Sequence, residues 1–291
     1  MEMYLPPAAT LVKAGYPSYL GSYSALDCYF GSNRSTFDII LTQGDLIALS
    51  RLFDELTFPG FPLEHAAARI GNRNIFFRCA DEIDPWQRNP FTVLDLRYDP
   101  RNKVFLDPHG VYRDLRRAEL VPVLDAHADW VRLTEAARLV SRYHYTADAA
   151  ELTLNHEPPP VAAGYQRQIL TDILTAPHPE KGLDLLLNAG LIDLWWPEIS
   201  ALTTVDHAKD HHPEGGGWQH TLATFGHRKR PDMELSLALL LHDIGKPCSR
   251  PMGNKRFYGH ADIGAQVATR FLKRLGFEES VVRKVAFLVL Y

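Results

Sequence analysis

Hydrophobic residues are spaced differently in the two halves of the chain. Up to about residue 120, short β-prone runs bounded by turn residues predict four strands, at residues 37–41, 74–77, 91–96 and 103–106. Between the first two strands, apolar side chains recur at helical spacing and predict a helix over residues 45–56 that lies on the sheet. These side chains are Leu46, Leu49, Leu52, Phe53 and Leu56. This half is predicted to be an α/β or α+β domain.

From about Asp129 onward the apolar pattern predicts helices only. Pro158-Pro159-Pro160 is a stiff break between two of them. Residues 232–241 form a strongly apolar helix, and residues 280–291 keep helical periodicity to the last residue without a terminal cap. The chain therefore ends inside a helix, and we expect a further segment to follow that helix normally.

The composition is that of an ordinary folded protein. The 291 residues favour two domains, and 46% hydrophobic with 23% charged residues excludes disordered, collagen-like and coiled-coil chains. Lys plus Arg (31) minus Asp plus Glu (35) gives a net charge of −4. Because no global basic field attracts nucleic acid, any RNA contact would have to use a local patch.

We expect a cytoplasmic protein with no membrane partner. The longest strongly apolar run, residues 235–241, is far too short to cross a bilayer, and the N-terminus lacks the pattern of a secretory signal. The three cysteines, Cys28, Cys79 and Cys248, are widely separated and contain no CxxC pair. They are predicted to be reduced thiols rather than disulfides or zinc ligands.

Histidines concentrate in the last third of the chain, where they give the strongest chemical signal. Seven of the 13 lie beyond residue 205: His207, His211, His212, His220, His227, His242 and His260. The adjacent pair His242-Asp243 ends the apolar helix, and burying both unpaired would cost several kcal/mol. Gly245 follows, ending the helix and letting Lys246 approach the same face. Imidazole and carboxylate are ligands that hold a divalent ion and leave a position open for water.

A histidine, then a helix-borne His-Asp pair, then a Gly-His resembles the HD phosphohydrolase superfamily. That resemblance implies His220, His242 and Asp243 as metal ligands, and a metal-activated water that attacks a phosphoester. It also places Lys246 on the phosphate side and Asp243 among the catalytic residues. The resemblance implies a divalent ion, Mn, Ni, Zn or Mg, without determining which of them binds. The family's closing aspartate lies beyond residue 291, so the fourth ligand is absent or is supplied by His260 or Asp262.

Longer strings resemble the bacterial tRNA nucleotidyltransferase and poly(A) polymerase family, whose members often carry an HD domain. They are residues 105–110 (FLDPHG) with Arg113-Asp114-Leu115, Arg132 with Glu135 and Arg138, Gly190-Leu191 through Trp196-Pro197-Glu198-Ile199, residues 211–215 (HHPEG) and HDIGKP at 242–247. The resemblance implies an α+β protein: a nucleotidyltransferase-like α/β head (1–125), an all-helical neck (126–204) and an HD domain (205–291) that looks C-terminally incomplete.

The head departs from this family at its catalytic positions. At the family's Gly-Gly turn, Ser22 and Tyr23 replace the glycines and Leu26 the arginine, so only Asp27 is kept. Tyr23 would obstruct the approach of phosphate to the backbone, and loss of the arginine removes a charge-assisted contact. The paired metal-binding carboxylates align with Thr36-Phe37-Asp38, which leaves a single acid at Asp38. We therefore expect a degenerate head.

Two more strings bear on what the head retains. Residues 89–95 (NPFTVLD) match a family strand but lack its Asp and Asn, so the fold is expected to be kept without the chemistry. Glu135 and Arg138, at i and i+3, resemble the family's nucleotide-reading pair, although a surface ion pair is an equal alternative.

Three functions follow from these observations. The first is a metal-dependent phosphohydrolase that acts on a nucleotide, a cyclic phosphate or an RNA end. The second is residual transfer of nucleotides to the 3′ end of tRNA or another RNA. The third is a non-catalytic nucleotide- or RNA-binding protein with a local phosphate-binding face formed by Arg113, Arg116, Arg117, Arg132, Arg138 and Arg142.

Overall fold

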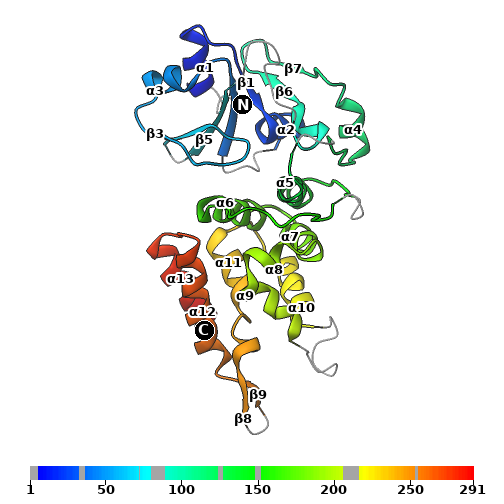
Figure 1. Cartoon of the computed structure of the whole chain (residues 1–291), viewed down its shortest axis with the longest axis vertical. Coiled ribbons are helices and arrows are strands. Elements are labelled where there is room, and N and C mark those ends of the chain that lie inside the picture. The colour runs from blue at the N-terminus through cyan, green and yellow to red at the C-terminus, as the bar shows by residue number, and fades with distance from the viewer. Residues whose placement is uncertain are drawn as a thin grey trace. The chain divides into compact units, whose positions relative to one another are not determined.

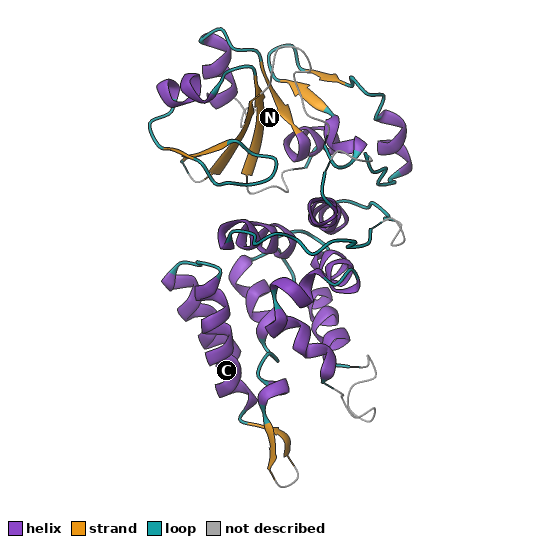
Figure 2. Cartoon of the chain, in the orientation of Figure 1, coloured by secondary structure: helices purple, strands orange, loops and turns teal. Residues whose placement is uncertain are grey.

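The computed structural model describes residues 6–32, 37–71, 73–79, 89–123, 127–147, 152–205, 216–252 and 255–291. It divides into two compact units. Unit 1 comprises Met1–Ala136 and Tyr145–Asp148, and unit 2 comprises Ala137–His144 and Ala149–Tyr291. In Figure 2 the strands of unit 1 form one sheet, whereas unit 2 is helical apart from one hairpin. The predicted α+β class is confirmed.

Unit 1 is built on a seven-stranded sheet in the order β3-β4-β5-β2-β1-β6-β7 (Figure 1). The strands are β1 (Ser18–Gly21), β2 (Phe37–Thr42), β3 (Leu56–Thr57), β4 (Ala66–Ile70), β5 (Arg73–Cys79), β6 (Arg97–Asp99) and β7 (Val104–Leu106). The helices are α1 (Pro6–Lys13), α2 (Ser22–Phe30), α3 (Leu46–Leu52) and α4 (Tyr112–Arg117), and α5 (Asp129–Arg142) begins in this unit. Strands β2 and β5 are parallel, with Asp38 opposite Ile75, and the other pairings are antiparallel.

Every residue of β2 is buried, so an apolar layer covers each face of the sheet. On one face Ala8 and Leu11 of α1 and Leu49 of α3 pack in one cluster with strand residues such as Ile40 and Phe77. On the other face Tyr23 of α2 meets the ring of Phe37 edge-on at 6.0 Å. Since α2 begins directly where β1 ends, the residues of the β1–α2 turn lie at the edge of this second layer.

Two predicted elements of unit 1 were wrong in detail. The helix predicted over 45–56 covers only Leu46–Leu52, capped by Asp45. It ends there because the ring of Phe53 packs on Phe77 at 4.9 Å and Leu56 pairs with β4. The predicted strand at 91–96 is a 3-10 turn, η1 (Thr92–Asp95).

The loop around this turn explains why no strand forms. Pro90 cannot donate a ladder hydrogen bond, and the Asp95 carboxylate accepts from the backbone and the side chain of Asn89, which closes the segment on itself. The strands predicted at 37–41, 74–77 and 103–106 are confirmed by β2, β5 and β7.

Unit 2 contains the end of α5 and eight further helices in its described segments. They are α6 (Ala163–Leu174), α7 (Pro179–Asn188), α8 (Leu191–Trp195), α9 (Pro197–Ser200), α10 (Gly217–Thr224), α11 (Met233–Leu241), α12 (His260–Arg274) and α13 (Glu279–Leu290). Three 3-10 turns join them: η2 (Ala201–Thr204), η3 (Phe225–His227) and η4 (Lys246–Cys248). The hairpin β8 (Arg250–Met252) with β9 (Lys255–Tyr258) corrects the prediction that this half is helical only.

Buried polar contacts fix the helices of unit 2. The Arg228 guanidinium donates to the carbonyls of Leu174 and Ala176, which satisfies the open carbonyls at the end of α6. It also donates to Ser236 of α11 at 2.7 Å, so one side chain ties the two helices together. Among the helices of the described residues, none is long and apolar enough to cross a membrane.

The three cysteines are free, and we predict that they differ sharply in reactivity. Burial and the nearby Asp27 and Asp38 raise the pKa of Cys28 to about 11, and burial and Asp45 raise the pKa of Cys79 to about 11. A rise from 9.0 lowers the thiolate fraction at pH 8 about 100-fold, whereas Cys248 is exposed. Labelling with a chromogenic disulfide at pH 8 is expected to show one fast thiol, which Cys248→Ser removes. A second fast thiol would contradict this.

Candidate metal centre

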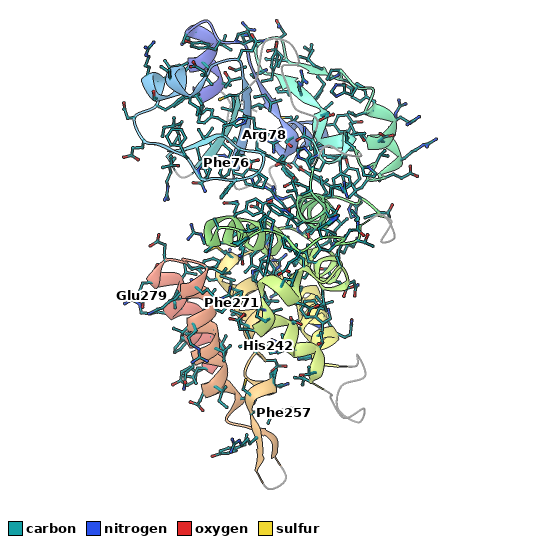
Figure 3. The ribbon with its side chains drawn as sticks, in the orientation of Figure 1. Phe76, Arg78, His242, Phe257, Phe271 and Glu279 are labelled. Carbon is teal, nitrogen blue, oxygen red and sulfur yellow. The ribbon has the colours of Figure 1, made fainter. Side chains whose placement is uncertain are left out.

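His220, His242 and Asp243 form a compact group of metal-ligand type. One ligand atom from each side chain lies within 4.8 Å of the other two, and no other such group occurs among the residues that the structure describes. His220 projects from α10, and His242 caps the end of α11, followed directly by Asp243. Figure 3 labels His242 in this region and Phe257 on the hairpin below it. The structure therefore brings together the three ligands that the sequence predicts at the end of the apolar helix.

Asp243 is the hub of the group. Its carboxylate is 4% exposed, and Oδ2 lies 3.2 Å from His242 Nε2 and 3.8 Å from His220 Nε2. Lys246 Nζ donates to the same oxygen at 2.7 Å and lies 5.5 Å from the ring centroid of Phe257. The two imidazole rings and the Lys246 ammonium thus all lie close to the single carboxylate of Asp243.

Electrostatics keep this carboxylate ionised. Burial would raise the pKa of Asp243, but the adjacent His242 imidazole and the Lys246 ammonium outweigh burial and hold the pKa well below its ordinary value. Burial likewise opposes a charge on His242, and the Asp243 carboxylate outweighs burial and raises the pKa of that imidazole.

The histidines are oriented as metal ligands usually are. His242 Nδ1 donates to the Leu239 carbonyl at 2.8 Å, which leaves the lone pair of the neutral ring on Nε2. That Nε2 is buried, and its 3.2 Å contact with Asp243 Oδ2 lacks the geometry of a hydrogen bond. An ionised carboxylate beside a buried imidazole nitrogen that carries its lone pair suits a divalent ion. The residues present therefore fit a bound divalent metal.

His260 borders this group. It begins α12, its Nδ1 donates to the Phe257 carbonyl at 2.9 Å, and its Nε2 lies 4.0 Å from Asp243 Oδ1. Its side chain is 37% exposed, and it is not a member of the compact group. Asp262, the other substitute for a fourth ligand, is exposed on the first turn of α12. His260 as a ligand stays a prediction.

Gly245 sets the distance between the His-Asp turn and α12, a role that its assignment as a helix terminator missed. A Cβ at this position would lie 2.1 Å from the His260 carbonyl oxygen and 2.5 Å from the Gly264 nitrogen, both backbone atoms. The helix itself ends earlier, at Leu241. Glycine at both 245 and 264 is the sequence signal that could have indicated this close approach.

We expect Gly245→Ala to weaken metal binding about 10- to 100-fold. The added Cβ would push the turn that carries His242 and Asp243 away from the backbone at the start of α12, and so displace the ligands. Calorimetric titration with Mn²⁺ measures the effect. Gly226→Ala is the matched control, since a Cβ there meets nothing within 4 Å. Equal affinities for the two variants would contradict the expectation.

In unit 1, the residues that align with the family's nucleotidyltransferase site make contacts with other residues of the same chain. Ser22 keeps a left-handed backbone (φ 51°), the conformation that a glycine would adopt without strain. Tyr23 is fully buried, and its hydroxyl donates to the Glu135 carboxylate at 2.8 Å. Asp27 is 2% exposed and accepts from Ser32 at 3.2 Å.

Arg73 engages Asp38, the one acid at the positions that align with the family's carboxylate pair. Arg73 Nε donates to Asp38 Oδ2 at 2.7 Å and Nη2 donates to Oδ1 at 2.9 Å, a bidentate pair. Sequence reasoning missed Arg73, and only the parallel pairing of β5 with β2 brings it to Asp38. Thr36 and residues 211–215 lie outside the described residues.

Arg138 of unit 2 is not a surface residue. It is buried, as is Arg142, and both guanidinium groups face Asp172 of α6, at 2.7 and 3.6 Å. Arg132 pairs with Asp129 and is 16% exposed. The predicted six-arginine phosphate-binding face is therefore wrong for Arg138 and Arg142, because both are buried against Asp172. For Arg132 it stays a prediction.

The comparisons agree with the fold, and the matched family region contains the histidine cluster. The HD domain family model matches residues 217–290, which include all three clustered residues. The chain is 33% identical over 199 residues to a CC-adding tRNA nucleotidyltransferase of Thermus thermophilus, covering 62% of this chain and 45% of that protein. It is 31% identical over 236 residues to a multifunctional CCA protein of Halorhodospira halophila, covering 73% and 56%.

Solved structures show the same fold. The crystal structure of the Bacillus stearothermophilus CCA-adding enzyme in complex with CTP matches with a TM-score of 0.51 at 17% identity, over 96% of this chain and 76% of that one. This is an HD-domain protein with a sheet-containing head. It belongs to the tRNA nucleotidyltransferase (CCA-adding) family. The chain spans about half the length of the sequence relatives it matches.

Proposed function

We propose that this protein is a metal-dependent phosphohydrolase of the HD type, acting on a nucleotide, a cyclic phosphate or an RNA end. The observation that carries the proposal is the His220–His242–Asp243 group, with its buried, ionised carboxylate and its lone-pair-bearing Nε2 atom. These three side chains would hold the ion, and His260 is a candidate for a further ligand. A divalent ion there supplies Lewis-acid polarisation of the phosphoester and activation of water.

The chain's own residues would handle the charge of the substrate. The ammonium of Lys246 is 11% exposed, already inside the site, and held against Asp243 and the Phe257 ring. It can attract a phosphate oxygen without being drawn in from solvent, which limits the entropy lost on binding. His242 is oriented by the Leu239 carbonyl, so it contributes to a preformed site.

The test is hydrolysis of a 2′,3′-cyclic nucleotide and of bis-p-nitrophenyl phosphate by metal-loaded protein. Wild-type protein is expected to turn over at least one of them with Mn²⁺ or Ni²⁺. His242→Ala and Asp243→Ala are expected to abolish turnover, and Lys246→Met to reduce it about 100-fold. Lys273→Met, which changes an exposed lysine on the same unit, is the matched control. Metal-loaded protein that hydrolyses neither ester would remove the proposal's support.

Nucleotide addition to an RNA 3′ end is the second candidate, because the relatives' names describe that activity. Against it stands the bidentate ion pair of Asp38 with Arg73, which engages both oxygens of the single acid. A two-metal transfer site needs carboxylate oxygens free to bind Mg²⁺. Incorporation of labelled CTP or ATP into tRNA above the level of an Asp38→Asn variant would support this second candidate.

A further inference from the structure

Phe257, on strand β9, contacts two functional side chains of the histidine site. Its ring centroid lies 5.5 Å from Lys246 Nζ, within the range of a cation–π interaction. Its carbonyl oxygen accepts from His260 Nδ1 at 2.9 Å. Both partners border Asp243, since Lys246 Nζ lies 2.7 Å from Oδ2 and His260 Nε2 lies 4.0 Å from Oδ1. One residue of the hairpin thus touches two of the groups that flank this carboxylate.

The hairpin β8–β9 is joined to the site at both of its ends. Only Ser249 separates β8 from η4, the turn that carries Lys246, and only Gly259 separates β9 from α12. Ser249 Oγ donates to the Lys246 carbonyl at 2.8 Å. Gly259 has a left-handed backbone (φ 70°), which lets the chain turn directly from β9 into α12. The position of the Phe257 ring is therefore set by the same elements that carry Lys246 and His260.

Lys246 needs an attractive partner besides Asp243 if the same carboxylate is to hold a divalent ion. Two cations at one carboxylate repel each other, and the flexible lysine stem would let the ammonium leave the site. The face of an aromatic ring attracts an ammonium but offers no nitrogen, oxygen or sulfur atom to a metal ion. The Phe257 ring meets this requirement, and the Lys246 side chain beside it is 11% exposed.

We propose that Phe257 is a positioning residue of the histidine site, whose ring holds the Lys246 ammonium beside Asp243, ready to meet a phosphate oxygen of the substrate. The inference rests on the proposed phosphohydrolase function and adds the hairpin β8–β9 to the parts of the chain that form the site. Successive side chains of a strand point to opposite faces, so Tyr258, which is 51% exposed, lies on the other face of the hairpin. The role is therefore assigned to the ring of Phe257 alone.

The first test is a double-mutant cycle on the stability of the full chain in urea with EDTA, which depends on neither metal nor turnover. Phe257→Leu and Lys246→Met are made singly and together. Because the ring attracts the ammonium, their effects on the unfolding equilibrium constant are expected to be coupled by about two- to fivefold. Tyr258→Leu, combined with Lys246→Met in the same way, is the matched control and should show no coupling. Absence of coupling between Phe257 and Lys246 would overturn the proposal.

The second test is hydrolysis of bis-p-nitrophenyl phosphate by the Mn²⁺-loaded protein. Phe257→Leu is expected to lower kcat/KM about 5- to 30-fold, whereas Phe257→Tyr, which keeps a ring face, should stay within about twofold of the wild type. In the Lys246→Met background, Phe257→Leu should have no further effect, because the ammonium that the ring holds is already gone. An equal loss in the two backgrounds would mean that the ring acts on another group, which would overturn the proposal.

Mn²⁺ affinity gives a readout besides activity. Phe257→Leu keeps the backbone carbonyl that orients His260, so calorimetric titration is expected to give an affinity within about twofold of the wild type. A larger loss of affinity, or a loss of turnover in Tyr258→Leu as large as in Phe257→Leu, would show that the whole hairpin is disturbed, and would also overturn the proposal. Wild-type protein that hydrolyses no ester would instead remove the phosphohydrolase function, while the unfolding cycle still decides whether the ring holds Lys246.

Discussion

Asp243→Asn is expected to abolish stoichiometric binding of a divalent ion. The carboxylate touches every other group of the cluster, and the amide removes both its charge and a lone-pair site. Loss of a charged ligand should lower metal affinity by more than the about 10- to 100-fold typical of the surrounding shell. Elemental mass spectrometry after incubation with Mn²⁺, Ni²⁺ or Zn²⁺, followed by desalting, measures the ion content per chain.

The control for this variant is Asp54→Asn, the same chemical change at an exposed position of unit 1. It is expected to bind the ion like the wild type. His220→Ala and His242→Ala should each lose the ion, and His260→Ala reports whether His260 contributes. A full equivalent of metal retained by Asp243→Asn would show that the cluster is not the binding site.

Asp172→Ala is expected to lower the free energy of unfolding of unit 2 by about 3–5 kcal/mol, because it strips a buried carboxylate from two buried arginines. Asp172 is fully buried, and Arg138 and Arg142 are 5% and 0% exposed. Urea unfolding is followed by tryptophan fluorescence with Trp86 and Trp130 of unit 1 replaced by Phe, so that the signal comes from Trp195, Trp196 and Trp218 of unit 2. The exposed-site control Asp262→Ala should change stability by less than about 0.5 kcal/mol.

A second variant separates loss of charge balance from loss of packing. Adding Arg142→Met to Asp172→Ala removes one of the two uncompensated charges with a side chain of similar length, so part of the stability should return. A loss below about 1 kcal/mol for Asp172→Ala would show that the two guanidinium groups are stabilised elsewhere in unit 2.

Asp172 also bears on the nucleotide-reading role that the sequence predicts for Glu135 and Arg138, which stays a prediction. Its guanidinium faces Asp172, and Glu135 accepts from Tyr23, so each member of the i, i+3 pair already has a buried partner in its own unit. Binding a base would require breaking these contacts. The surface ion pair, the other interpretation of Glu135 and Arg138, is wrong because both residues are buried.

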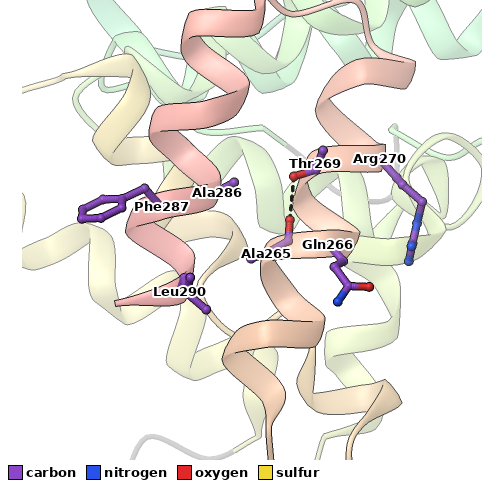
Figure 4. Close-up of a pocket in the computed structure, with 7 residues that line it drawn as sticks. All are labelled: Ala265, Gln266, Thr269, Arg270, Ala286, Phe287 and Leu290. Atoms are coloured by element: carbon purple, nitrogen blue, oxygen red, sulfur yellow. Dashed lines mark hydrogen bonds between the residues drawn. The ribbon is translucent and has the colours of Figure 1, made fainter.

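A groove runs along α12 and α13. It has a volume of about 460 Å³ and is lined by residues such as Ala265, Thr269 and Phe287, while Thr269 bonds the Ala265 carbonyl within its own helix (Figure 4). None of its lining residues belongs to the histidine cluster. The substrate of the proposed reaction is therefore expected at the histidines, not in this groove.

The sequence by itself determined the local elements and the histidine site. Apolar spacing located α11 and α13. The adjacency of His242 and Asp243 at a helix end put two candidate ligands side by side, because neighbours in a chain cannot be far apart. Family-like spacing added His220. Strand signals were weaker: segment 91–96 has β-prone residues, but the carboxylate of Asp95 holds it in a turn.

Only the tertiary structure decided how the charges are paired. Arg73 reaches Asp38 across parallel strands, Asp172 reaches Arg138 from another helix, and Gly245 meets the backbone of α12, all through contacts between residues distant in sequence. Periodicity reports which face of an element is buried, but not which residue of another element lies opposite. For this reason the six arginines that looked alike in sequence separated into the buried Arg138 and Arg142, the partly exposed Arg132, and three exposed residues on α4.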